Sequence, residues 1–153
     1  MHCMKKIFFN EKLIIILAHT RQYAIQAGSN VIDTSTNYEL GESETMIGRV
    51  LNGMINELVI EREEVVVMSK IGYMQGPNLK EARERETQSK PYSQVSKLHP
   101  FHWHCIAPEF IGDQLEHSLN RLNLEQLDVL FLHNPEYCWN RNVCETVILS
   151  FFL

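Results

Sequence analysis

Positive charge is scarce in this chain, and long apolar runs are absent from it. Lysine and arginine number 14 against 19 aspartates and glutamates among 153 residues, which leaves a net charge of −5 and a pI near 5.8. Nucleic-acid binders usually carry a basic stripe instead. The longest apolar stretch is LIIILA at 13–18, whereas a transmembrane helix needs about 18 such residues. We therefore expect no nucleic-acid partner and no membrane partner.

Cysteine is also sparse, and it is not arranged for disulfides or a metal. The chain has no C-x-x-C pair, and its spacing does not match a small secreted scaffold. The four cysteines are Cys3, Cys105, Cys138 and Cys144. We interpret them as reduced thiols, which predicts a cytoplasmic location, with an organelle as the alternative. A signal peptide is disfavoured because polar residues 10–12 interrupt the first apolar segment and no small-residue cleavage site follows it.

The sequence does contain three short apolar runs that each end in a polar or charged residue. They are NVID (30–33), EVVVMSK (64–70) and LDVLFLH (127–133). Continuous runs of this length are typical of strands buried on both faces, as in parallel sheets. With 44% hydrophobic and 22% charged residues, the composition is that of one ordinary folded domain.

Helical patterns separate these runs. We expect a helix over 20–27 that stops at Gly28, an amphipathic helix over 43–56, and a third that begins at Pro108 and runs to about residue 123. Residues 71–107 are predicted to form a long loop with one or two helical turns in LKEARERE. Alternating helices and strands of this kind indicate right-handed βαβ units, an α/β fold and a parallel sheet.

The polar residues at the strand ends suggest chemistry. The carboxyl ends of parallel strands meet at one edge, where such folds bind ligands, so Asp33, Lys70 and His133 should lie together, with Tyr38 in the following loop. A lysine cation favours the ionised form of a tyrosine, a carboxylate keeps the lysine charged, and a neutral histidine can donate a hydrogen bond to a carbonyl oxygen. Such a site could protonate a carbonyl while a nicotinamide cofactor supplies hydride.

These motifs together resemble one known family, the aldo-keto reductases. The matching stretches are IDTSTNYELGESE (32–44), REEVVVMSK (62–70), LEHSLNRLNLEQL (115–127) and DVLFLH (128–133). The resemblance implies that Tyr38 is the general acid and Lys70 the cation beside it. It also implies that Asp33 is the counter-ion of the lysine and a cofactor contact, and that His133 orients the substrate. YMQGPNLKEARERE and WHCIAPEF look similar to a longer-looped branch of the family.

The resemblance covers residues 20–137 and implies a (β/α)8 TIM barrel that reduces aldehydes or ketones, or oxidises alcohols, with NADP(H) in first place and NAD(H) as the alternative. Such a barrel needs about 250 residues, and at least about 200. We therefore expect a partial barrel, about its first half, and a truncated chain. Residues 1–19 stay unassigned, with LIIILA as a substitute first strand, and 138–153 form a divergent tail.

Two further interpretations stay open. The chain could be a non-catalytic half-barrel that pairs with another chain or with itself through exposed strand edges, or that is unstable. It could also hold zinc in HPFHWHC, through His99, His102, His104 and Cys105. Structural zinc sites usually draw paired ligands from separate elements, so we favour a polar loop anchored by Trp103 and predict no metal.

Overall fold

A computed structural model of the chain describes residues 19, 20 and 22–139. The predictions for residues 1–18, including LIIILA and Cys3, fall outside this part of the chain. So do those for residues 140–153, including Cys144. Within the described residues, no helix combines the length and the apolar character that crossing a membrane requires.

Three parallel strands form the main sheet, in the order β1-β2-β6. They are β1 (Val31–Asp33), β2 (Val66–Ile71) and β6 (Val129–Leu132), so each of the three apolar runs is confirmed as a strand. Asp33 lies beside Met68 and Lys70 beside Phe131. Before β1, residues 19, 20 and 22–26 are helical, and Gly28 follows with a φ of +96°, as expected of a glycine just past a helix. The βαβ arrangement confirms a partial barrel.

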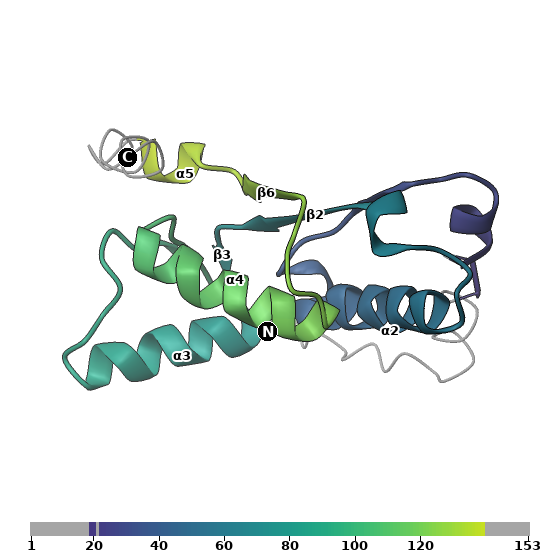
Figure 1. Ribbon diagram of the computed structural model, residues 1–153. Helices are drawn as coiled ribbons and strands as arrows, with labels where there is room; N and C mark the ends of the chain where they lie inside the picture. The colour runs from purple at the N-terminus through teal and green to yellow at the C-terminus, as the bar shows by residue number, and fades with distance from the viewer. Residues whose placement is uncertain (1–18, 21, 140–153) are drawn as a thin grey trace, which may run out of the picture.

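Two helices cover one face of this sheet, α2 (Glu42–Asn56) and α4 (Pro108–Leu122) (Figure 1). Pro108 begins α4, as predicted. Val67 of β2 packs into one buried cluster with Ile47 and Leu51 of α2 and Leu122 of α4. The two helices approach closely at Gly48, where a Cβ would lie 2.5 Å from the carbonyl oxygen of Leu122. This glycine therefore serves helix packing, although it weakens the helix that contains it.

The opposite face of the sheet is not covered by described residues. Side chains alternate across β2, where Val67, Ser69 and Ile71 are fully buried while their neighbours are only half-buried. On the uncovered face Val31 is 53% exposed and Phe131 is 45% exposed. The expectation of strands buried on both faces is therefore wrong within this part of the chain, because the helices pack on one side only.

The segment between β2 and α4 is a folded insertion, and the predicted long loop is wrong. It contains β3 (Tyr73–Met74), α3 (Gly76–Thr87), β4 (Ser96–His99) and β5 (His102–His104). The strands form an antiparallel sheet in the order β3-β5-β4. Reciprocal bonds between Gln75 and Asn78 cap α3, which then runs three turns instead of the one or two expected. Three short elements complete the described chain. The helix α5 (Glu136–Trp139) follows β6, the turn η1 (Tyr38–Gly41) precedes α2, and the turn η2 (Arg62–Glu64) precedes β2.

Candidate active site

The three residues expected at the strand ends, and Tyr38 in the loop after the first of them, lie at one edge of the parallel sheet. Asp33 ends β1, Lys70 lies near the end of β2, His133 follows β6, and Tyr38 begins η1. The Lys70 ammonium donates to Asp33 Oδ1 at 2.6 Å and to the Thr34 carbonyl at 2.9 Å. It also lies 3.5 Å from Tyr38 Oη and 5.1 Å from the centre of that ring. The structure thus brings together the carboxylate, the cation and the phenol.

The lysine leaves the phenolic proton available. An ammonium group has three protons and no acceptor, and Lys70 has three acceptors, namely Asp33, Thr34 and the Tyr38 oxygen. Tyr38 accepts in this contact, so its own O–H can be donated elsewhere. Its side chain is 39% exposed, and a substrate oxygen can approach it from solvent. This arrangement suits a general acid, whose contacts often shorten only when substrate binds.

His133 lies next to this group, in a crowded setting. Its ring meets the Tyr38 ring edge-on, with 6.2 Å between centres, and the Tyr73 ring at 4.7 Å. Its Nδ1 lies 3.0 Å from Ser35 Oγ. Burial and the nearby Lys70 charge lower the pKa of His133 below its ordinary value. The imidazole is therefore neutral near pH 7 and can take part in hydrogen bonding without adding a second cation.

The folded insertion contacts the backbone of His133 through His104. His104 is fully buried, and its Nε2 lies 2.6 Å from the carbonyl oxygen of His133. Since a carbonyl only accepts, Nε2 carries the proton, and Nδ1 accepts from the Cys138 thiol at 3.2 Å. Burial lowers the pKa of His104, which keeps it neutral. Gly72 is required here, because a Cβ on it would lie 2.6 Å from His104 Nε2.

The remaining members of the histidine and cysteine cluster do not gather around a common point. His99 is exposed at the end of β4, while Cys105 is buried and donates to the Ser93 carbonyl. Across the residues that the structure places, no three histidine, cysteine, aspartate or glutamate side chains are positioned to hold a metal ion. Trp103 is 7% exposed and lies in β5, so it anchors a strand instead of the expected loop.

The comparisons with known proteins bear on this geometry. A model of the aldo/keto reductase family matches residues 17–149. The chain belongs to the aldo/keto reductase family. Among curated relatives of this aldo/keto reductase chain, an aldo-keto reductase of Alternaria alternata is 34% identical and covers 74% of the chain. The NADH-specific methylglyoxal reductase of Escherichia coli is 27% identical over 72% of the chain.

Solved aldo/keto reductases share the fold. One from Bacillus halodurans in its holo form superposes with a TM-score of 0.56 at 18% identity over 78% of this chain. One from Bombyx mori in complex with NADP gives 0.52 at 20% identity over 80% of this chain. The chain spans only 28–31% of the length of these four proteins.

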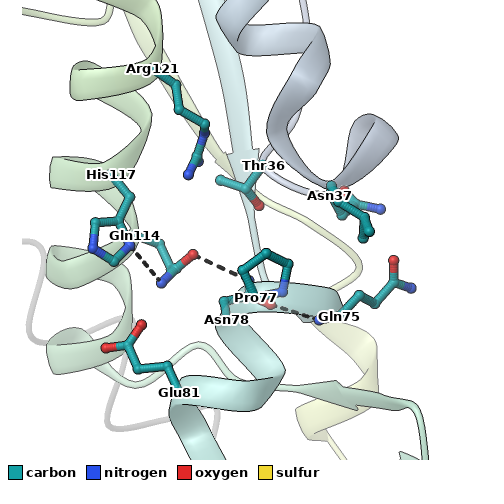
Figure 2. A pocket seen from close by; sticks show the side chains of 10 residues that line it. Thr36, Asn37, Gln75, Pro77, Asn78, Glu81, Gln114, His117 and Arg121 are labelled. Atoms are coloured by element: carbon teal, nitrogen blue, oxygen red, sulfur yellow. Dashed lines mark hydrogen bonds between the residues drawn. The ribbon is translucent and has the colours of Figure 1, made fainter. Parts of the chain in front are cut away.

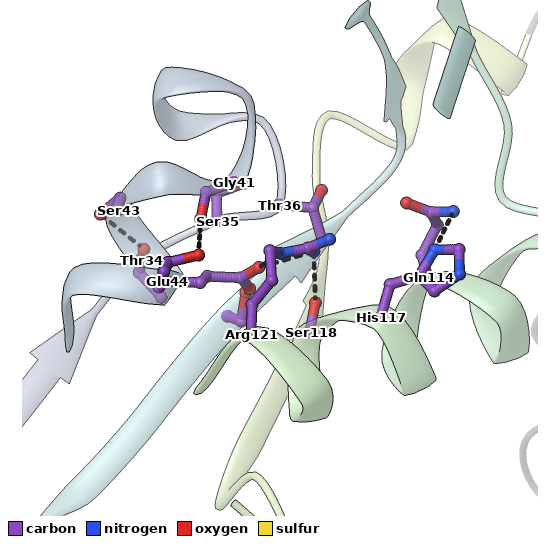
Figure 3. A network of polar contacts seen from close by, with 12 residues as sticks. Thr34, Ser35, Thr36, Gly41, Ser43, Glu44, Gln114, His117, Ser118 and Arg121 are labelled. Carbon is purple, nitrogen blue, oxygen red and sulfur yellow. Dashed lines mark hydrogen bonds and ion pairs between the residues drawn. The ribbon is translucent and has the colours of Figure 1, made fainter. Parts of the chain in front are cut away.

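A second polar cluster in this aldo/keto reductase chain was not expected from the sequence. A glutamate in the first turn of a helix ordinarily faces solvent, yet Glu44 is fully buried. Ser69 donates to its Oε1 at 2.6 Å, and Arg121 of α4 donates to its Oε2 at 2.7 Å (Figure 3). Arg121 also donates to Ser118 at 3.3 Å. A polar Ser69 on the buried face of an apolar strand was the signal that a partner lies opposite.

A small pocket of about 110 Å³ lies beside this cluster, between α3, α4 and the loop after β1 (Figure 2). Its polar walls are largely bonded to one another. Asn78 donates to Gln114 at 3.2 Å, and Arg121 is already paired with Glu44. The guanidinium of Arg121 is therefore already neutralised at this pocket, which lies where the insertion meets α4.

Proposed function

We propose that this chain carries the proton-handling side of an aldo/keto reductase site, which reduces an aldehyde or ketone with NAD(P)H or oxidises an alcohol in reverse. One observation supports this most directly. Lys70 Nζ lies 2.6 Å from the Asp33 carboxylate and 3.5 Å from the Tyr38 hydroxyl, at the carboxyl ends of parallel strands. Because the chain spans less than a third of its relatives, the activity is a proposal for the chain as it stands.

The roles follow from the contacts. Tyr38 donates its proton to the substrate oxygen, and Lys70 stabilises the phenolate that remains. Asp33 holds the lysine by its 2.6 Å ion pair and presents a half-exposed carboxylate to a bound cofactor. His133 orients the substrate oxygen from the other side. When bound, the nicotinamide supplies hydride to the carbonyl carbon.

The side chains that are present fit a nicotinamide cofactor on chemical grounds. A phenol, a cation and a carboxylate stand at an edge next to a sheet face that no described helix covers. NADP(H) is the first candidate, since one similar structure holds NADP. NAD(H) is the alternative, since one relative is named as NADH-specific. A small carbonyl compound as substrate and a cytoplasmic location stay predictions.

The test uses the purified full chain. NADPH and NADH are titrated while nucleotide fluorescence is followed, and oxidation of each is then measured with a panel of aldehydes and ketones. We expect saturable quenching and aldehyde-dependent oxidation. Quenching without turnover would support cofactor binding and count against catalysis by this chain, whereas neither signal would overturn the proposal.

The second candidate function is a non-catalytic half-barrel that pairs with another copy of itself. The observation in its favour is the uncovered sheet face, on which Val31 is 53% exposed and Phe131 is 45% exposed. Apolar surface of this kind favours association. Sedimentation analysis over a range of concentrations should then show a dimer. A monomer that unfolds cooperatively would count against this function.

A further inference from the structure

Ser35 is a fully buried hydroxyl within the candidate active site to which the sequence assigns no role. Its Oγ lies 2.5 Å from Asn37 Oδ1, 3.0 Å from His133 Nδ1 and 3.2 Å from the carbonyl oxygen of Lys70. It thus lies between the lysine strand and the histidine loop. A buried hydroxyl with one proton and three neighbouring atoms has to divide its hydrogen bonds among them.

The distances decide where the proton goes. The shortest contact, 2.5 Å to the Asn37 amide oxygen, requires a donor, and Ser35 is the donor in it. With its proton used there, Ser35 can only accept from His133 Nδ1. Nδ1 therefore carries the ring proton. A neutral imidazole has a single N–H, so its Nε2 is left unprotonated.

We infer that Ser35 is a positioning residue that holds neutral His133 in the Nδ1–H tautomer, with Asn37 keeping the serine proton turned away from the ring. The tautomer itself stands on geometry alone, and its role in the reaction rests on the proposed function. Thr36 provides a matched contrast. It also donates to the Lys70 carbonyl at 3.2 Å, but its hydroxyl does not bond the histidine ring.

This assignment changes what the site recognises. An unprotonated Nε2 accepts a hydrogen bond, so neutral His133 binds a hydroxyl group, either of an alcohol or of a tyrosine. Donation to a carbonyl oxygen, the role expected from the sequence, needs a second proton on the ring. Neutral His133 thus favours the alcohol as ligand, and its protonated form favours the carbonyl compound.

The test is nitrogen NMR of the histidine rings in the full chain labelled with ¹⁵N. It is recorded at about pH 8, well above the ordinary histidine pKa of about 6.5. The His133→Gln variant identifies the signals of His133 among the seven histidines. We expect a protonated, pyrrole-type Nδ1 and an unprotonated, pyridine-type Nε2. The opposite pattern in the wild-type chain would overturn the tautomer assignment, whether or not the chain has activity.

Three variants then test the cause. Ser35→Ala removes the acceptor, so the ring proton should move toward Nε2, while Thr36→Ala should leave the wild-type pattern unchanged. Asn37→Ala removes one acceptor of the serine proton but leaves the Lys70 carbonyl, so it should shift the pattern less than Ser35→Ala does. If Ser35→Ala lowers the thermal midpoint too far for study, Ser35→Cys decides, because a thiol is a weak acceptor. An unchanged His133 spectrum in the Ser35 variant studied would contradict the role of Ser35.

The same variants test the consequence for ligands if the chain turns over. Relative to wild type, Ser35→Ala should bind alcohols more weakly at about pH 8, while the Thr36→Ala control does not. Equal losses for alcohol and carbonyl ligands would show that the serine acts only on stability. Absent turnover in every variant would count against the proposed function and leave the NMR result standing.

Discussion

The chain contains two carboxylate–cation pairs of almost equal length, one with an exposed carboxylate and one with a buried carboxylate. Asp33 and Lys70 lie 2.6 Å apart, with side chains 51% and 18% exposed. Glu44 and Arg121 lie 2.7 Å apart, and the glutamate is fully buried while the arginine is 27% exposed. The first pair lies at the mouth of the sheet, and the second lies between the sheet and its covering helices.

The difference in burial separates two roles. An exposed pair contributes at most about 1 kcal/mol to stability because water screens it, so the Asp33–Lys70 pair is free to serve chemistry. A buried pair that loses one partner leaves an uncompensated charge, which costs about 3–5 kcal/mol. Glu44 and Arg121 therefore fix how α2 and α4 meet the sheet. A large loss of stability on mutating the Asp33–Lys70 pair, with little loss on mutating the Glu44–Arg121 pair, would contradict this assignment of roles.

The largest expected effect concerns the exposed pair. Lys70→Met removes the cation that we propose acts on Tyr38, and we expect kcat for carbonyl reduction to fall by about 10²-fold or more. Urea unfolding should show a stability change of about 1 kcal/mol or less. Lys80→Met removes an exposed lysine paired only within its own helix and should change neither quantity. A large stability loss in Lys70→Met would give this pair the structural role.

The buried pair should show the reverse pattern. Arg121→Met leaves Glu44 without its cation and should lower the free energy of unfolding by about 3 kcal/mol. Arg49→Met, on an exposed position of α2, should stay within about 0.5 kcal/mol. Replacing both partners in a Glu44→Met/Arg121→Met variant should recover much of the loss. A double variant no more stable than Arg121→Met would contradict the assigned cause.

The two glycines of α2 test the packing of α2 against α4, which the buried pair also fixes, because Gly48 lies at the helix contact and Gly53 does not. Gly48→Ala places a Cβ 2.5 Å from the Leu122 carbonyl oxygen and should destabilise the chain by about 1–3 kcal/mol. At Gly53, no atom that the structure describes outside the surrounding helix turn lies within 4 Å of the added Cβ, so Gly53→Ala should stabilise the chain by about 0.5–1 kcal/mol. Thermal unfolding of both variants provides the measurement. Effects of the same sign would argue against close helix packing at Gly48.

The smallest effect is a dependence on pH. The pKa values of His104 and His133 are both lowered in the folded chain, chiefly by burial, so the unfolded chain binds more protons. Stability is therefore full above about pH 6.5 and falls as the pH drops through the folded pKa values. Urea midpoints measured against pH should show this fall. It should be shallower in His104→Gln and unchanged in His99→Gln, and an equal fall in all three proteins would rule out His104 as a source.

The parallel strands could be predicted because each is a short continuous apolar run, and the helices that pack on them because their apolar residues recur every three to four positions. The strand-end residues followed from that topology, since Asp33, Lys70 and His133 come at the carboxyl ends. The insertion could not be predicted in this way. In α3 only Leu79 and Ala82 are buried, too few to show a helical stripe. The signals available for this helix were its many residues of high helix propensity and Pro77 in its first turn.

The buried pair escaped prediction for a different physical reason. A glutamate in the first turn of a helix, as Glu44 is, normally faces solvent and interacts with the helix dipole. Its burial depends on Arg121, 77 residues later in the chain, and no local pattern announces such a contact. Ser35 was missed similarly, because its partner His133 is 98 residues away.

The most direct test of the central claim compares Tyr38→Phe with Tyr23→Phe in NADPH-dependent aldehyde reduction by the full chain. Tyr38 lies 3.5 Å from Lys70 Nζ, whereas Tyr23 is 75% exposed and is separate from the site residues in the sequence. We expect Tyr38→Phe to lower kcat by about 10²–10⁴-fold with unchanged stability, and Tyr23→Phe to behave like the wild type. Undiminished activity in Tyr38→Phe would contradict the role of Tyr38 as the general acid.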